Sequence, residues 1–403
     1  MRYTIGQLAE IIDGDRGKNY PKQDEFYPQG YCLFLNTGNV TKEGLIFEEN
    51  QFIMKEKDEA LRKGKLKRGD IVYTTRGTVG NAGYYNSSVP YENVRINSGM
   101  VILRSNGEIV DARFLYQILK SEYYRPYFKQ YCTGSAQPQL PIKNFSQIYL
   151  NVPDIKTQHR IADILSAYDN LIENNQKQIK LLEEAAQRLY KEWFVNLRFP
   201  GHENTKIVDG VPEGWQWCKV RDVADINSSA LPKNYKEDFI DYVDLGSVRC
   251  GHIETRTRYN LNEAPGRAKR CAKDGDIIWG MVRPNLKAYA LVTNPKETDV
   301  FSTGFAVLSA KKVPYSYLYC AVTQEEFVGY LVNATNGAAY PAVKPVHFEV
   351  ADILKPDDKV LEQFHSVADS IYRKKEALEN QNHNLRESRD LILPKLMSGE
   401  VEV

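Results

Sequence analysis

Two loops of this chain present an arginine shortly after a short run of apolar residues, 71–73 in one case and 277–279 in the other. A guanidinium or ammonium group can donate to guanine O6 and N7, and an asparagine amide can pair with adenine N6 and N7. Simple β-turns would also be rich in Gly and Asn. We favour DNA contact for Arg76 and Arg283 and leave both interpretations open for the others. The DNA-binding candidates in these loops are Arg76, Asn81, Arg283, Asn285 and Lys287.

A basic cluster precedes each apolar run. Most charge runs are solvated surface, but recurrence at an equivalent place favours contacts with phosphates, which orient a protein on DNA without reading its sequence. The residues predicted to make such contacts are Arg62, Lys65, Lys67 and Arg68 in the first cluster, and Arg256, Arg258, Lys269 and Arg270 in the second.

A third polar loop lies ahead of each of two long helical tracts. Its candidates are Gln137 and Lys143 in the first copy, and Tyr340 and Lys344 in the second. These loops could contact DNA or simply join a module to its helix, and the sequence favours neither interpretation.

Catalytic chemistry is not predicted. The stretch Pro356-Asp357-Asp358-Lys359 resembles a metal-dependent nuclease signature, but a similar stretch, 153–156, stands at the other helix entrance, so helix capping explains both better. A phosphate-binding loop and an Asn/Asp-Pro-Pro-aromatic motif are both missing from the sequence. The six histidines show no metal-ligand spacing. We therefore expect no catalytic residue, metal or cofactor in this chain.

The elements that must position these residues come from an internal repeat. Gly134–Leu140 returns 203 residues later as 337–343, and apolar residues recur every seven residues in the tract that follows each copy. A sustained heptad pattern predicts a long coiled-coil helix. The heptad positions are Ile161, Tyr168, Asn175, Leu182 and Leu189 in the first copy, and Phe364, Ile371, Leu378, Leu385 and Ile392 in the second.

The ends of these helices can also be predicted. So can the second row of residues in the seam, which is the line of contact between a coiled-coil helix and its partner. Each helix should begin near its Pro-Asp pair, the first should run to about Phe194, and the second should stop around Leu393 because Pro394 removes a backbone donor. Three residues beyond the heptad positions, Ile164, Leu171 and Ala185 are expected to complete the first seam, with Leu165, Ile172 and Ile179 widening it. In the second copy the same offset gives Val367, then polar Lys374, Gln381 and Ser388, which predicts a narrower seam.

The predicted fold class is α+β, with two repeated mixed modules separated by two long helices. The expected segments are 1–152, the first module; 153–199, the first helix; 200–355, the second module; and 356–403, the second helix. Unlike modules at a set separation suit a reader of two half-sites. Pattern alone leaves open a two-headed protein-interaction scaffold, and a stand-alone nuclease or methyltransferase is a further alternative.

Composition limits the class of protein but does not identify it. A net charge of +1 argues against a generic polycation, although local basic patches can still bind phosphates. The six cysteines are scattered, so reduced thiols in a cytoplasmic protein are expected. No apolar run is long enough for a membrane span, and the first residues do not look like a secretory signal.

Four stretches, taken in order, resemble the specificity subunit of type I restriction-modification systems over essentially the whole chain. They are 134–140 (GSAQPQL), 158–166 (QHRIADILS), 193–201 (WFVNLRFPG) and 393–400 (LPKLMSGE). The resemblance implies two target-recognition domains that each read one half of a split, asymmetric DNA site. It implies an antiparallel coiled coil that sets the spacer and docks two methyltransferase subunits. S-adenosylmethionine would bind those subunits, and separate ATP-driven, Mg-dependent restriction subunits would cut unmodified DNA.

Overall fold

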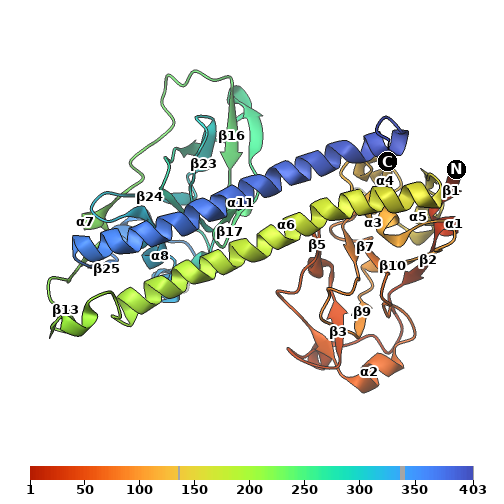
Figure 1. Ribbon diagram of the computed structural model, residues 1–403, viewed down its shortest axis with the longest axis horizontal. Coiled ribbons are helices and arrows are strands. Elements are labelled where there is room, and N and C mark those ends of the chain that lie inside the picture. Colours follow the sequence, from red (N-terminus) through yellow and green to blue (C-terminus); the bar gives the residue numbers. More distant parts are fainter. Residues whose placement is uncertain (135–136, 336–340, 403) are drawn as a thin grey trace. The chain divides into compact units, whose positions relative to one another are not determined.

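The computed structural model describes residues 1–134, 137–335 and 341–402. The chain divides into two compact units: Met1–Asn174 with Gln381–Val403, and Asn175–Asn380. Each unit contains one β-rich module and part of each of two long helices, α6 (Ile155–Tyr190) and α11 (Asp358–Ser398) (Figure 1). The four segment boundaries expected from the sequence stay a prediction.

Module 1 is built on two sheets. The strands of the first sheet, in spatial order, are β2 (Ala9–Asp13), β10 (Met100–Ser105), β7 (Ile71–Thr74) and β8 (Ala82–Tyr84). Those of the second are β6 (Phe52–Ile53), β3 (Cys32–Leu35) and β9 (Val94–Ile96). The remaining elements are β1 (Arg2–Thr4), α1 (Ile5–Leu8), β4 (Val40–Thr41), β5 (Gly44–Leu45), α2 (Lys55–Ala60), α3 (Ala112–Lys120), α4 (Arg125–Lys129), α5 (Ile142–Ser146) and β11 (Tyr149–Asn151).

Strand β7 is apolar on both faces because both faces of its sheet are covered. Ile71 and Tyr73 pack in one core cluster with Phe114 of α3 and Phe145 of α5. Val72 points the other way, into the cluster formed with the second sheet. A strand buried on both faces reads as a continuous apolar run rather than an alternating one.

Module 2 repeats this plan. The first sheet is β15 (Ala224–Ile226), β24 (Phe305–Ala310), β21 (Ile277–Gly280) and β22 (Tyr289–Leu291). The second is β19 (Thr257–Asn260), β16 (Phe239–Val243), β23 (Asp299–Ser302) and β20 (Ala268–Arg270). The other elements are β12 (Ile207–Val208), β13 (Val211–Pro212), β14 (Gln216–Lys219), α7 (Val220–Val223), β17 (Val248–Arg249), β18 (His252–Ile253), α8 (Tyr315–Val322), α9 (Glu325–Asn333), α10 (Pro345–Glu349) and β25 (Asp352–Lys355).

The two long helices pack against each other in antiparallel fashion within each unit. In the first unit Arg389 of α11 bonds to Asp169 of α6. In the second, Lys375 pairs with Glu183 at 2.7 Å. The residue number rises along α6 as that of its partner falls along α11, which confirms the α+β fold with an antiparallel helix pair. Of the predicted heptad positions, Ile161, Phe364 and Leu378 are buried. Asn175 is also buried, and the others are partly buried, namely Tyr168, Leu182, Leu189, Ile371, Leu385 and Ile392.

The second row of the seam was predicted only in part: Leu165, Ile172 and Ile179, expected to widen the seam, are buried, whereas Leu171 and Ala185, expected to complete it, are exposed. It lies four residues after the heptad positions: Leu165, Ile172, Ile179 and Ala186 are at most 6% exposed. Leu171 is 49% exposed, and Val367, predicted for the same row in α11, is 46% exposed. In α11 the true second row runs through Ala368, Lys375, Asn382, Arg389 and Leu396.

Both helix entrances are capped by the acids of the Pro-Asp pairs. Asp154 Oδ1 accepts hydrogen bonds from the backbone N–H of Lys156 and Thr157, at 3.0 and 3.1 Å. Asp357 Oδ1 accepts one from Val360 N–H at 3.0 Å. Capping therefore accounts for the stretch that resembles a nuclease signature.

The end of α11 differs from the prediction. The helix continues through Pro394 to Ser398 and ends at Gly399, whose φ is +76°. Leu393 and Leu396, each 3% exposed, pack into the core of module 1. Burying a leucine contributes about 1.5–3 kcal/mol, so the two together offset the roughly 3 kcal/mol cost of an internal proline. The first helix ends as expected, in a π-helical turn over Lys191–Val195.

Candidate nucleic-acid interface

Three loops meet at one end of the first sheet of module 1. The N–H groups of Thr75 and Arg76 donate to Gly99 O at 2.9 and 3.1 Å. Leu140 N–H donates to Thr75 O at 2.9 Å, and Arg76 and Gln139 form an isolated β-bridge. The loop after β7 and the loop before α5 are therefore held together by backbone bonds. We call this arrangement the loop junction.

Module 2 has the same loop junction. Met281 N–H donates to Gly304 O and Val343 N–H donates to Met281 O, both at 2.9 Å. Arg283 N–H donates to Pro341 O at 2.8 Å. Arg283 and Lys287 have φ values of +50° and +54°, a left-handed conformation that is uncommon for residues with a side chain. The bond to Pro341 O holds Arg283 in this conformation, and Lys287 N–H donates to Pro284 O at 3.0 Å within the same turn.

The structure leaves most of the predicted loop residues exposed. Those with exposed side chains are Arg76, Gln137, Lys143, Arg283, Asn285 and Lys344. Lys287 is partly buried and pairs with Glu325 at 2.5 Å. Asn81 is 5% exposed, and its Nδ2 donates to Val40 O at 2.9 Å, so its amide serves the fold. Tyr340 lies outside the described residues.

The two basic clusters lie elsewhere, on the second sheet of each module. Leu66 N–H donates to Val94 O of β9 at 2.9 Å, which holds the first cluster beside that strand. In module 2 the strand β20, which carries Lys269 and Arg270, pairs with β23. Lys269 and Arg270 thus lie at the sheet edge that corresponds to the first cluster, whereas Arg258 lies on β19, at the opposite edge of the same sheet.

Buried acids hold several of these cations in module 1. Asp58, with 2% of its side chain exposed, pairs with Lys65 and with the buried Arg95, each at 2.5 Å. Burial would raise the pKa of Asp58, but hydrogen bonds from Lys65 and Arg95 lower it below its ordinary value. Arg62, 72% exposed, pairs with the buried Asp15 at 3.2 Å.

Arg68 and Lys67 differ in how far their head groups are engaged. The Arg68 guanidinium stacks on Tyr85, 4.2 Å from the ring centroid, and donates to three backbone carbonyls, among them Val89 O at 3.0 Å and Tyr91 O at 3.1 Å. It is therefore largely engaged in the fold. The side chain of Lys67 is exposed.

Module 2 uses the same arrangement of buried acids beneath exposed cations. Asp241 accepts two hydrogen bonds from Arg258, at 2.9 and 3.0 Å, and those bonds lower the pKa of Asp241. Asp299 pairs with Arg256 at 3.2 Å. Lys269 is exposed and Arg270 is partly buried. These pairs orient the head groups and partly cancel their charge, which fits a chain whose net charge is only +1.

Sequence reasoning missed the acids. Asp58 and Arg95 are 37 residues apart, and Asp241 and Arg258 are 17 apart, so no local pattern links them. An aspartate within a run of β-forming residues, as in Phe239–Val243, is the only available signal, because strands disfavour Asp unless a partner compensates.

The described residues contain no candidate metal site, disulfide or membrane-spanning helix. No group of three His, Cys, Asp or Glu side chains within 1–134, 137–335 and 341–402 is placed to hold a metal ion. All six cysteines are free thiols. No helix in the part of the chain that the structure describes is long and apolar enough to cross a bilayer.

Comparison with known proteins gives consistent results. A family model described as "Type I restriction modification DNA specificity domain" matches residues 1–184. The chain is 25% identical to the type I restriction enzyme MjaIX specificity subunit of Methanocaldococcus jannaschii, covering 86% of this chain and 81% of that one. It is 23% identical to the HindI specificity subunit of Haemophilus influenzae, covering 98% and 100%.

A solved structure has the same fold. The crystal structure of a type I restriction-modification system S subunit from M. genitalium matches with a TM-score of 0.56 and 14% identity, covering 98% of this chain and 95% of that chain. At that identity the match concerns the fold alone.

Proposed function

Because this chain belongs to the family of type I restriction-modification specificity subunits, the non-catalytic DNA-specificity members of those systems, we propose that it reads a bipartite, asymmetric DNA site. Each module would read one half-site. The observation that carries this proposal is the duplicated loop junction. Each copy exposes an arginine, while the residues around that arginine differ between the copies.

The two sets of polar residues have different proposed roles. Arg76 and Arg283 would contact base edges, since a guanidinium reads guanine through two hydrogen bonds. The exposed cations of the basic clusters would contact phosphates and fix the orientation of each module on the duplex. These include Lys67 and Lys269, together with Arg62 and Arg258, whose side chains remain more than half exposed beside their acids.

The same proposal includes partners and their cofactors. The helix pair would dock two methyltransferase subunits, and separate restriction subunits would join that assembly. S-adenosylmethionine, ATP and Mg²⁺ would be bound by those partners. Family membership supports this part of the proposal.

Selection from a random duplex DNA pool tests the proposal. The purified chain should enrich two short motifs separated by a constant gap. Arg76→Ala should relax one motif and Arg283→Ala the other, each weakening specific binding by about 1–3 kcal/mol if it removes a base contact. Arg188→Ala on α6, a residue 80% exposed, is the matched control.

Three outcomes would each contradict one part of this proposal. Equal weakening on selected and random DNA would make an arginine a phosphate contact. Enrichment of no sequence at all, alone and with methyltransferase subunits, would favour the two-headed interaction scaffold. Cleavage or methyl transfer by the purified chain alone would contradict a non-catalytic role.

A further inference from the structure

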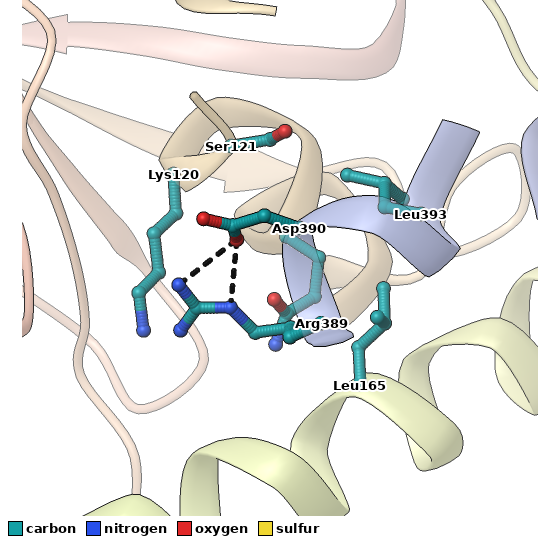
Figure 2. A pocket seen from close by; sticks show the side chains of 7 residues that line it. Lys120, Ser121, Leu165, Arg389, Asp390 and Leu393 are labelled. Atoms are coloured by element: carbon teal, nitrogen blue, oxygen red, sulfur yellow. Dashed lines mark hydrogen bonds and ion pairs between the residues drawn. The ribbon is translucent and has the colours of Figure 1, made fainter. Parts of the chain in front are cut away.

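Two charged contacts join α6 to α11, and each places a cation of α11 in the buried seam. In the first unit, Asp169 accepts from Arg389 at 2.7 Å, from Lys120 of α3 at 3.1 Å and from Gln117 Nε2 at 2.7 Å. Arg389 is 12% exposed and Lys120 is 7% exposed. Figure 2 shows the small pocket beside this contact, which Lys120 and Arg389 line and where Arg389 is also bonded to its neighbour Asp390.

The second contact lies in the other unit. Lys375, 7% exposed, pairs with Glu183 at 2.7 Å and donates to Gly251 O at 2.8 Å. His252 lies between Glu183 and Glu379, at 3.4 and 2.7 Å. In both contacts the acid belongs to α6 and the seam cation to α11, so the charges of the two helices are complementary.

The fold does not require charge at these places, as the internal repeat shows. Residues 203 positions away from Lys120, Asp169 and Arg389 are Thr323, Tyr372 and Ala186. In the second unit Tyr372 OH contacts Cys320 Sγ at 3.0 Å, and both residues are at most 2% exposed. A neutral cluster therefore packs there, whereas the first unit has three ionised groups.

The two ion pairs disfavour shifted registers of α6 on α11 that a purely apolar seam would tolerate. Apolar heptads can slip by seven residues and still bury apolar side chains. After such a slip Asp169 would face Asn382 or Leu396 of α11, and Glu183 would face Ala368 or Asn382. Each of these four groups would then lose its partner on the other helix, and removing one partner of a buried ion pair is strongly destabilising.

A slip of two heptads is also excluded. Asp169 and Glu183 are 14 residues apart, and so are Lys375 and Arg389. Moving one helix by that distance rebuilds one contact and breaks the other. Only one register satisfies both.

We propose that Asp169, Arg389, Glu183 and Lys375 are positioning residues that select the register of α6 on α11 and thereby the gap between the two DNA half-sites. The register part rests on the contacts above. The consequence for the gap rests on the proposed function.

The first readout does not involve DNA. Leu165 and Leu393 line the same small pocket, so Leu165→Cys with Leu393→Cys should cross-link under mild oxidation in the present register. Leu165→Cys with Arg386→Cys should cross-link only after a slip of seven residues. Peptide mapping distinguishes these bonds from any involving the six native cysteines.

The cross-link pairs are compared in the wild-type chain and in a neutral variant. That variant combines Lys120→Thr, Asp169→Tyr and Arg389→Ala, which copy the second repeat, with Glu183→Gln and Lys375→Ile. We expect only the first cross-link in the wild type and both in the neutral variant. Glu184→Gln with Arg188→Gln, which removes an exposed pair on α6, should behave as the wild type.

The second readout is the gap selected from the random duplex pool. A slip of seven residues moves one helix by about 10.5 Å, or about three base pairs. The neutral variant should accept such gaps, with its preference for the wild-type gap reduced about tenfold. A wild-type chain that selects no motif would count against the proposed function, while the cross-links would still test the register.

A folded neutral variant that shows only the first cross-link overturns the inference. If the five substitutions together prevent folding, as judged by circular dichroism, the two groups of substitutions are tested separately. Each is then expected to yield some of the slipped cross-link. Absence of that cross-link from both overturns the inference equally.

Discussion

Individual side chains of this protein show how one carboxylate can position a basic residue that would otherwise be mobile. Asp58, Asp241 and Asp299 are all buried, and each has an arginine or lysine that reaches toward the surface. A buried aspartate costs free energy unless it is paired. The cations satisfy that requirement and are in turn held in one orientation, which lowers the entropy that they would lose on meeting a phosphate.

His252 makes the stability of the second unit depend on pH. Burial would lower its pKa, but hydrogen bonds to Glu183 and Glu379 raise it from 6.5 to about 9. Because the folded pKa lies above the unfolded one, the stabilisation is complete below about pH 6.5 and is lost as the pH rises through about 9. With the ring partly exposed, we expect a loss of about 1–2 kcal/mol.

Thermal unfolding at pH 6 and pH 9.5 measures this loss. His252→Asn should remove the part of the pH dependence that belongs to the second unit. His383→Asn is the matched control, because His383 is 70% exposed beside Glu387. An unfolding midpoint that falls equally in the wild type and in His252→Asn would contradict the prediction.

At the scale of the helix, residues of the same type on α6 differ in burial according to the face on which they lie. Leu165 is fully buried against the end of α11, whereas Leu171, six residues later, is 49% exposed. We expect Leu165→Ala to lower the free energy of unfolding by about 2–5 kcal/mol, because it leaves a cavity in the core. Leu171→Ala should change it by no more than about 0.5 kcal/mol. Urea unfolding of both variants measures the difference, and comparable losses would place the seam on the other row.

The sequence alone could not show which row of residues on each long helix faces the other helix. The rows three and four residues after the heptad positions are both apolar in α6: Ile164 and Leu165, then Leu171 and Ile172. In α11 the buried row contains Lys375, Asn382 and Arg389, which a hydrophobicity pattern assigns to solvent. The seven-residue period was correctly predicted because it depends on spacing alone, but the choice of row depends on the partner helix.

The candidate interface was predictable to a similar extent. The repeat located both arginine loops, and the structure confirms that they occupy equivalent places. Asn81 illustrates the remainder: its type suits adenine as well as that of Asn285 does, yet it is buried beneath Val40, a residue 41 positions away. Only the tertiary structure separates a polar residue that supports a loop from one that the loop presents.

For the molecule as a whole, the proposal that α6 and α11 set the gap between half-sites predicts the effect of lengthening them. Seven residues inserted after Leu171 in α6, and seven more after Glu387 in α11, would preserve the pairing on both sides of the insertion. The selected gap should then grow by about 10.5 Å, or about three base pairs. Insertion into α6 alone should instead disrupt the pairing.

Selection from the random duplex pool measures that gap, with circular dichroism as the check on folding. An unchanged gap in the folded double insertion would mean that the helices do not determine the spacing.

The packing of Leu393 and Leu396 into the core of module 1 has a consequence for biosynthesis. A ribosome makes the strands of that module early and these two leucines more than 200 residues later. Until they emerge, part of an apolar surface stays uncovered on the nascent chain, where it is open to chaperones and to aggregation. Module 1 should therefore acquire its full protection from proteases only after Leu393 and Leu396 have left the ribosome.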